Sequence, residues 1–264
     1  MISLPVVGPV CENPASQSPS EFDLAAFDRD GYVVARSLVH DDLLDRLQGV
    51  AARLLETRPR PVEFEADLGY PGSPRNRQDR GGSTPRRLLQ VIQAVPEIRA
   101  WATSTVMAGW IRALLGANKV AVATAHHNCL MTKLPKFSSR TRWHQDIRYW
   151  SFERTELVTA WLALGHENRR NGGLTVVPAL PPECFDEMLF LRKDFIDAES
   201  EFRRPKDVDL GPGDVLFFHC RLVHSARSNG THEPKLSLVF SYHPMSNLPI
   251  PGSRSASVDS IELP

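Results

Sequence analysis

The stretch TRWHQDIRYW, residues 141–150, combines aromatic and branched residues with one histidine and one aspartate, His144 and Asp146. This composition favours a β-strand. Residues i and i+2 of a strand point to the same face, so the strand would present an imidazole and a carboxylate to one point, with Gln145 turned away. The pair is either part of a metal site or a polar spot on a strand, and this stretch alone leaves both open.

Short β-rich runs follow one another through the C-terminal half, separated by Gly, Pro and Asn, as is typical of a sandwich or barrel. A strand and helical patterns precede them. The sequence therefore predicts an α+β chain in which N-terminal helices flank a jelly-roll-like core. The runs are VAVATAHHNCLMTKL (120–134), RWHQDIRYW (142–150), LVTAWLALG (157–165), LTVVP (174–178), DVLFFHC (214–220) and KLSLVFSYH (235–243).

The chain is predicted to consist of a mobile arm over residues 1–20 and a single domain over residues 21–264. A strand at GYVVA is followed by leucines and valines at helical spacing over residues 43–55. Residues 57–87, rich in Pro, Gly and Arg, predict a long ordered loop or lid. A second helical pattern covers residues 95–116, and a charged insert at 183–209 interrupts the later strands.

The overall charge gives no reason to expect a nucleic acid or membrane partner, because Lys plus Arg equals Asp plus Glu at 31 each. Four cysteines form no CxxC pair, so they are interpreted as reduced thiols rather than zinc ligands or disulfides. The first residues lack a basic start and a run long enough to span a bilayer. We therefore expect a cytoplasmic protein that binds a small molecule; its oligomeric state is left open.

A third metal ligand is expected on another strand, and GDVLFFHCRLVHSA (213–226) offers His219 and His224. These are five residues apart, so on a regular strand they would face opposite ways and only one would reach the metal. Two histidines and a carboxylate leave three positions of an octahedral Fe(II) open for a bidentate co-substrate and for oxygen. A closed zinc site would favour four ligands.

Lys235 and Ser237 begin an apolar run, two residues apart and 11 residues after His224. A dicarboxylate that is bound to iron through its keto acid end needs a cation and a hydroxyl for its far carboxylate, and Lys-x-Ser would supply both. The alternative is a lysine at a solvated strand end.

These residues resemble the phytanoyl-CoA dioxygenase (PhyH-like) family of Fe(II)/2-oxoglutarate oxygenases. The resemblance extends from FDRDGYVVARSLV (27–39) to KLSLVFSYH, and it is most specific in HQDIRYWSF, AWLALGHENRRNGGLTVVP and GDVLFFHCRLVHSARSNGTHEPK. It implies a double-stranded β-helix of the cupin type that uses Fe(2+), 2-oxoglutarate and O2. It also implies that His144, Asp146 and His224 are the catalytic metal ligands and that His219 is not one.

The sequence departs from the family pattern at three places. Lys235 stands where the family usually has an arginine for the 2-oxoglutarate carboxylate, and Ala226 replaces a serine often found after the distal ligand. A PGSH-like turn is replaced by PALPP at 178–182. The resemblance also implies that Trp161 lines the co-substrate pocket. A carboxylate at Asp146 disfavours halogenation, because halogenases of this kind have a small residue there.

Three residues are predicted to bind substrate. Arg148, two positions after Asp146, would share the ligand face of a strand, or is a solvated side chain at the strand's end. Tyr70 and Arg86 lie in GYPGSPRNRQDRGGSTPRR (69–87), which would close over an anion or is simply a wet surface. The other histidines, His126, His127, His166, His232 and His243, are interpreted as structural.

The sequence therefore predicts a 2-oxoglutarate-dependent non-haem iron dioxygenase that hydroxylates a C–H bond of a small anionic metabolite. An amino-acid derivative, an acyl-CoA and a secondary-metabolite intermediate all remain open as substrates. The absence of a C-terminal peroxisomal tag disfavours phytanoyl-CoA. The alternatives are a non-catalytic relative that acts as a sensor or scaffold, and a cupin-like metalloenzyme that works without 2-oxoglutarate.

Overall fold

The computed structural model describes residues 18–178 and 205–264. The predicted arm, apart from residues 18–20, lies outside the described residues, as do all but the first residue of PALPP and residues 183–204 of the charged insert. Among the described residues, every helix is too short or too polar to cross a membrane.

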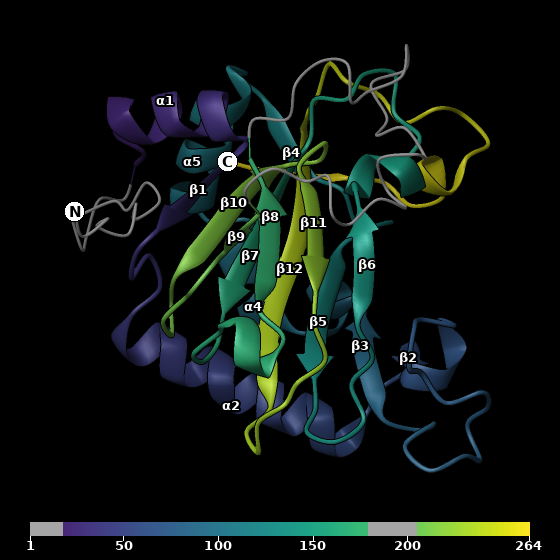
Figure 1. Ribbon diagram of the computed structural model, residues 1–264. Coiled ribbons are helices and arrows are strands. Elements are labelled where there is room, and N and C mark those ends of the chain that lie inside the picture. Colours follow the sequence, from purple (N-terminus) through teal and green to yellow (C-terminus); the bar gives the residue numbers. More distant parts are fainter. Residues whose placement is uncertain (1–17, 179–204) are drawn as a thin grey trace, which may run out of the picture.

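A large antiparallel sheet forms the back wall of the core (Figure 1). Its strand order is β1-β10-β7-β12-β5-β3-β2, and β4 pairs with both β12 and β13. The central strand β12 runs over Lys235–Pro244. The other strands are β1 (Tyr32–Ala35), β2 (Val62–Phe64), β3 (Pro85–Leu89), β4 (Val120–Val122), β5 (Asn128–Lys133), β7 (Val158–Ala163), β10 (Val215–His219) and β13 (Ile261–Glu262).

A smaller antiparallel sheet lies in front of the large one and has the order β6-β11-β8-β9. Its strands are β6 (Thr141–His144), β8 (Leu174–Val177), β9 (Lys206–Asp207) and β11 (Val223–Ala226). Together the two sheets form the cupin-like jelly roll that the sequence predicts, and the α+β fold class is confirmed.

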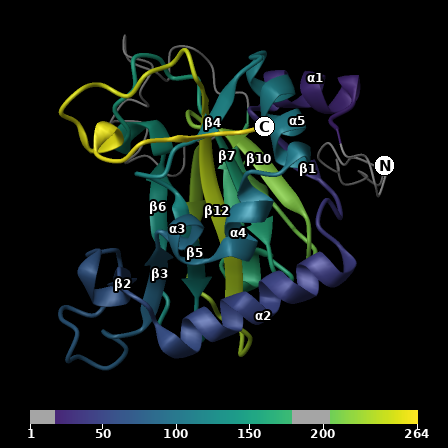
Figure 2. The same ribbon diagram turned by 180° about the vertical axis from the view of Figure 1, so that it is seen from behind.

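The helices cover the outer face of the large sheet, as the view from behind shows (Figure 2). The large sheet therefore has one core between its outer face and the helices and a second core between the two sheets. The side chains of strand β10 alternate between these two cores. Val215 and Phe217 face the helices, where Phe217 stacks on Trp110 with ring centroids 4.9 Å apart. Leu216 and Phe218 fill the space between the two sheets. The helices are α1 (Glu21–Asp30), α2 (Asp41–Thr57), α3 (Val91–Ala94), α4 (Pro96–Ala102) and α5 (Thr105–Leu115).

Two of the predicted elements differ from the structure. Residues 57–87 are not one long loop, because β2 and β3 pair there and β3 joins the large sheet next to β5. The helical pattern at 95–116 is interrupted: α4 ends at Ala102, and Ser104 starts α5 by accepting a hydrogen bond from the Met107 amide. A serine at this position satisfies an otherwise unpaired amide of the new helix.

Candidate metal centre and adjoining pocket

The first two predicted ligands lie where strand β6 ends. His144 is the last residue of β6, and Asp146 begins the 3-10 helix η2 (Asp146–Tyr149). The prediction of one continuous strand was therefore wrong, because η2 turns the chain: the Arg148 amide donates to the Gln145 carbonyl at 3.3 Å and the Ile147 amide to the Cys220 carbonyl at 3.1 Å. The turn brings the Asp146 carboxylate back beside the His144 ring.

His224 lies on β11, directly opposite His144 in the register of the smaller sheet. His219 belongs to β10 in the large sheet. The spacing argument, which placed both histidines on one regular strand, was therefore wrong on this point. The His219 ring lies near Phe27, at a centroid distance of 6.4 Å, and its Nδ1 accepts a hydrogen bond from the Arg221 amide. Of the two, His224 reaches the site.

His144, Asp146 and His224 converge on one point. One ligand atom from each lies within 4.8 Å of the others, and this is the only such His/Cys/Asp/Glu cluster among the residues that the structure describes. The Asp146 Oδ1 lies 3.7 Å from the Nε2 of His144 and 3.7 Å from the Nε2 of His224. Three protein donor atoms would fill half of the six positions of an octahedral Fe(II) and leave the other three open.

Backbone carbonyls fix the orientation of both imidazoles. Nδ1 of His144 donates to the Arg142 carbonyl at 2.9 Å, and Nδ1 of His224 donates to the Leu222 carbonyl at 3.0 Å. Because Nδ1 carries the proton, the neutral ring keeps its lone pair on Nε2, the atom that faces Asp146. Burial lowers the pKa of both histidines to about 4, so both rings are neutral at physiological pH.

One further side chain donates to the second oxygen of Asp146, and another lies beside this oxygen without a hydrogen bond. The Thr159 hydroxyl, from β7, donates to Oδ2 at 3.2 Å, and Nδ1 of His127 lies 3.5 Å from the same atom. Oδ1 is thereby left for a metal. Two neutral imidazoles and one carboxylate are the donor set of the facial triad of non-haem Fe(II) oxygenases, whereas a structural zinc site needs a fourth protein ligand. The residues present fit Fe(II).

The predicted co-substrate residues form a buried, closed network. Nζ of Lys235 lies 3.1 Å from Glu167 Oε2, 3.0 Å from the Ser237 hydroxyl and 4.5 Å from the centroid of the Trp161 ring. The Ser237 hydroxyl donates to Glu167 Oε1 at 2.6 Å, and Trp161 Nε1 donates to Oε2 at 3.0 Å. The three residues do come together, but around Glu167, a carboxylate of the protein itself.

A pocket connects this network with the metal centre. The residues that line it include all three ligands, Trp161, Lys235 and Ala226, and a group of further cations formed by Arg86, Arg87 and Lys133. The cationic lining fits a dicarboxylate such as 2-oxoglutarate, because each carboxylate needs a positive partner when water is excluded.

The predicted substrate residues lie at different depths. Arg86 is 1% exposed, and its guanidinium donates to Glu65, to the Ser139 carbonyl and to the Thr141 hydroxyl. Tyr70 lies over it, with the guanidinium carbon 5.2 Å from the ring centroid. Arg148 is exposed on η2 and does not follow the strand alternation from which its position was predicted.

The remaining arginines of residues 69–87 are mostly at the surface. Arg77 forms a two-pronged hydrogen bond with Asp67 and lies over Phe64, and Arg80 lies over Phe137. Arg87 donates to Glu63 and to the Tyr70 hydroxyl. Intramolecular contacts therefore account for Arg77, Arg80 and Arg87.

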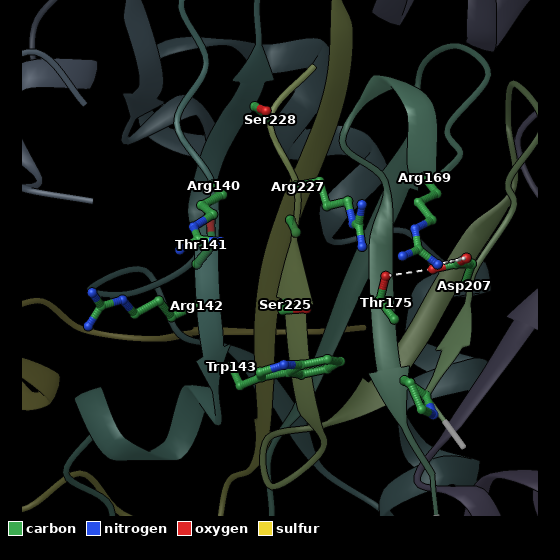
Figure 3. Close-up of a pocket in the computed structure, with 12 residues that line it drawn as sticks. Arg140, Thr141, Arg142, Trp143, Arg169, Thr175, Asp207, Ser225, Arg227 and Ser228 are labelled. Carbon is green, nitrogen blue, oxygen red and sulfur yellow. Dashed lines mark hydrogen bonds and ion pairs between the residues drawn. The ribbon is translucent and has the colours of Figure 1, made fainter. Parts of the chain in front are cut away.

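A second pocket lies on the outer face of the smaller sheet (Figure 3). Trp143 and Ser225, the neighbours of His144 and His224 in the chain, line it, so strand alternation directs it away from the metal centre. Arginines surround it, and Arg169 is paired with Asp207 at 3.2 Å. None of the three candidate metal ligands lines this pocket, although Thr141, Ser225 and Ala226 line both this pocket and the one at the candidate metal centre.

Several residues that build the site were not found from the sequence. Thr159 donates to Asp146, His127 lies beside the same carboxylate, Glu167 neutralises Lys235, and Lys133 adds a cation to the pocket. A signal existed for Glu167, because a buried lysine needs a carboxylate partner and a buried indole an acceptor. Nothing in the spacing of Thr159, His127 or Lys133 marks them, since their roles arise from pairing between distant strands.

An antiparallel jelly roll with a His-Asp-His cluster between its sheets, beside a cation-lined pocket, defines a mononuclear non-haem iron oxygenase of the 2-oxoglutarate-dependent class. The profile of the family "Phytanoyl-CoA dioxygenase (PhyH)" matches residues 27–237. The chain belongs to this family.

Individual relatives agree with this assignment. Peroxisomal phytanoyl-CoA dioxygenase of Mus musculus is 25% identical, over 88% of this chain and 73% of that protein. Ectoine dioxygenase of Sphingopyxis alaskensis is 26% identical, over 84% of this chain and 75% of that protein. The solved structure of the non-heme alpha ketoglutarate dependent carbocyclase SnoK from nogalamycin biosynthesis superimposes with a TM-score of 0.72 at 20% identity, covering 90% of this chain and 89% of that one. This last likeness concerns the fold.

Proposed function

We propose that this oxygenase hydroxylates a C–H bond of a small anionic metabolite. The observation that carries the proposal is the complete triad, in which Asp146 keeps a carboxylate at the metal, beside a pocket that contains four basic side chains. Bound Fe(II) and 2-oxoglutarate would supply activated oxygen for attack on an unreactive C–H bond.

The side chains of the chain itself would position the reaction. His144 and His224 present Nε2, and Asp146 presents Oδ1 while Thr159 holds its other oxygen. His224 and Asp146 are buried and His144 is partly buried, which limits the access of water to the metal. Donors fixed in this way need little rearrangement when the metal and the co-substrate enter.

An anionic substrate is supported by the charges around the mouth of the site. Arg148 and Tyr149 are exposed on η2, two and three residues after Asp146, and the Tyr149 ring lies 6.2 Å from the His144 ring. Arg86 lines the pocket, and the Tyr70 ring lies over its guanidinium. We propose that Arg148, Tyr70 and Arg86 contact the substrate. Cys129 and Cys220 are buried free thiols, which supports a reducing, cytoplasmic location.

The experiment is an anaerobically prepared Fe(II) enzyme, supplied with oxygen and 2-oxoglutarate and screened against acyl-CoAs, amino-acid derivatives and other small carboxylates. Formation of succinate that depends on one of these compounds, with a product that has gained one oxygen atom, is expected. A product that has lost two hydrogens without gaining oxygen and has formed no new double bond would instead indicate ring closure, the reaction type named for SnoK. Metal binding without succinate under any condition would favour a non-catalytic relative.

A further inference from the structure

The second pocket, on the outer face of the smaller sheet, has the size of a ligand site. Its volume is about 490 Å³, within the range of roughly 300–1,000 Å³ that is typical of small-molecule sites. Polar side chains in register across three strands line it: Ser225 on β11 pairs with Thr175 on β8, and Thr175 pairs with Asp207 on β9. Trp143 of β6 lies across the same face (Figure 3). The pocket therefore combines an aromatic side chain with polar groups.

The charges that line this pocket are unbalanced. Four arginines line it, and among its described lining residues Asp207 is the only carboxylate. Asp207 is already engaged, since it accepts a hydrogen bond from Thr175 at 2.7 Å and pairs with Arg169 at 3.2 Å. The three arginines without an ion-pair partner in the described part of the chain are Arg140, Arg142 and Arg227.

Arg227 and Arg169 form the cationic end of the pocket. Figure 3 shows both guanidinium groups reaching towards one another over β8, whereas Arg142 is directed away from the centre. Two positive charges held close together repel each other, and Asp207 neutralises only one of them. An anion bound between the two guanidinium groups would supply the missing negative charge, and their planar forks of donors match the oxygen atoms of a phosphate or a carboxylate.

The number of hydrogen-bond donors favours a phosphate. The hydroxyl groups of Ser225 and Ser228 also line the pocket, and neither forms a hydrogen bond with another described residue. Two guanidinium groups and two hydroxyls offer more donors than the two oxygens of one carboxylate would satisfy. A terminal phosphate presents three strong acceptor oxygens and carries about two negative charges at neutral pH.

The other end of the pocket is aromatic. His144 and His224 are register partners in β6 and β11. Their chain neighbours Trp143 and Ser225 therefore lie next to each other on the outer face, as Figure 3 shows. Arg227 follows Ser225 by two residues, which is roughly 7 Å along a strand. A ligand with a planar ring at one end and phosphate at the other, joined by a short link, would reach both ends. A nucleotide has this shape, because its ribose separates the base from the phosphates.

We propose that the outer pocket of the smaller sheet binds a nucleoside diphosphate, with the base against Trp143 and the phosphates between Arg227 and Arg169. The site goes beyond the proposed function, because none of the candidate metal ligands lines it. Contact between a base and an aromatic side chain tolerates any base, so the chemical class of the ligand is set by the ring and the phosphates rather than by one particular base.

The test is calorimetric titration of the Mn(II)-loaded protein, freed of excess metal, with ADP, adenosine and inorganic phosphate. ADP should bind more tightly than either fragment, because only ADP contacts both ends of the pocket. Arg227→Met should weaken ADP binding by roughly tenfold to a hundredfold, the equivalent of one charge-assisted contact. Arg170→Met is the matched control: Arg170 is exposed in the same 3-10 turn as Arg169 but does not line the pocket, so its affinity for ADP should equal that of the wild type.

A second variant tests the aromatic end. Trp143→Leu should weaken the binding of ADP by roughly fivefold to a hundredfold, in line with the loss of one base contact, and leave the binding of inorganic phosphate unchanged. If Trp143→Leu folds poorly by circular dichroism, Arg227→Met decides alone, since the Arg227 side chain is exposed. Saturating 2-oxoglutarate should leave the affinity of the wild type for ADP unchanged, because the metal ligands line the other pocket.

The proposal is overturned if ADP binds no more tightly than inorganic phosphate, which would indicate a cationic surface that attracts any anion. It is also overturned if Arg227→Met and Arg170→Met bind ADP equally well. Competition between ADP and 2-oxoglutarate would place ADP at the metal centre and contradict the proposal too. Each of these results leaves the proposed function intact, because formation of succinate tests that function separately.

Discussion

The two ends of the active-site pocket differ in whether their polar groups are hydrogen-bonded to one another. At the metal end, Oδ1 of Asp146 lies 3.7 Å from Nε2 of His144 and 3.7 Å from Nε2 of His224, and neither Nε2 carries a hydrogen to donate. At the far end, the Lys235 ammonium donates a hydrogen bond to the Glu167 carboxylate and forms an ion pair with it. Unsatisfied donor atoms that converge indicate a binding site, whereas buried polar groups that satisfy one another form part of its wall.

The largest effect is expected at the metal end. His144→Ala, Asp146→Ala and His224→Ala should each abolish 2-oxoglutarate turnover and weaken Mn(II) binding strongly, because each would remove one of the three proposed ligands among the described residues. His219→Ala should keep substantial turnover, since its ring lies in the other sheet. Succinate formation measures the turnover of each variant, and titration with Mn(II) measures its metal affinity. The assignment of the ligands would be refuted if His219→Ala were inactive while His224→Ala was active.

Breaking the closed network on one side should cost stability rather than metal binding. Lys235→Met leaves the Glu167 carboxylate, 1% exposed, without its cation, and should lower the free energy of unfolding by about 3–5 kcal/mol. The double change with Glu167→Gln should recover most of this loss. Urea denaturation measures both. Arg154→Met, in the exposed pair with Glu156, is the control and should cost less than about 1 kcal/mol. Equal losses in the single and double variants would contradict the pairing.

The metal-free protein should lose stability as the pH falls from 6.5 towards 4. Burial lowers the pKa of His224 to about 4 from an ordinary value of 6.5, so in this range the unfolded chain binds a proton that the folded protein excludes. Unfolding therefore becomes easier as the pH drops, and the difference levels off below 4. His224→Asn should show a shallower decline than the wild type in urea titrations at stepped pH. Parallel pH profiles for the two proteins would refute the buried neutral ring.

The smallest effect is expected for a change at Arg148, which is exposed on η2 and belongs to neither end of the pocket. Arg148→Ala should raise the KM for an anionic substrate by several-fold, in line with the loss of one partly solvated ionic contact. Turnover of 2-oxoglutarate in the absence of substrate should stay nearly the same. Arg154→Ala is a matched surface control. A substrate that both Arg148→Ala and the wild type handle equally well would argue against a role for Arg148.

The sequence was most informative where local spacing and strand patterning suffice. The jelly roll, the flanking helices and the pairing of His144 with Asp146 follow from short β-rich runs and from the HxD motif, although η2 rather than a strand brings Asp146 to the site. The choice of His224 over His219 needed the family resemblance, because the turn at residues 220–222 separates them into two strands.

The contacts at the far end of the pocket could not be predicted from the spacing of residues in the sequence. Lys235 lies where a carboxylate anchor was expected, yet its partner Glu167 comes from a segment 68 residues earlier in the chain. Likewise, Lys133 reaches the pocket only because β5 pairs with β12. Contacts between distant strands decide which cation is paired and which is not, and no local pattern encodes them.

The most direct test of the central claim is anomalous X-ray diffraction at the iron edge from crystals grown with Fe(II) and 2-oxoglutarate without oxygen. The predicted result is one strong peak bounded by Nε2 of His144, Nε2 of His224 and Oδ1 of Asp146, with the keto acid end of 2-oxoglutarate on its open side. A peak elsewhere in the molecule, or a fully occupied metal that lacks any one of these three ligands, would contradict the account.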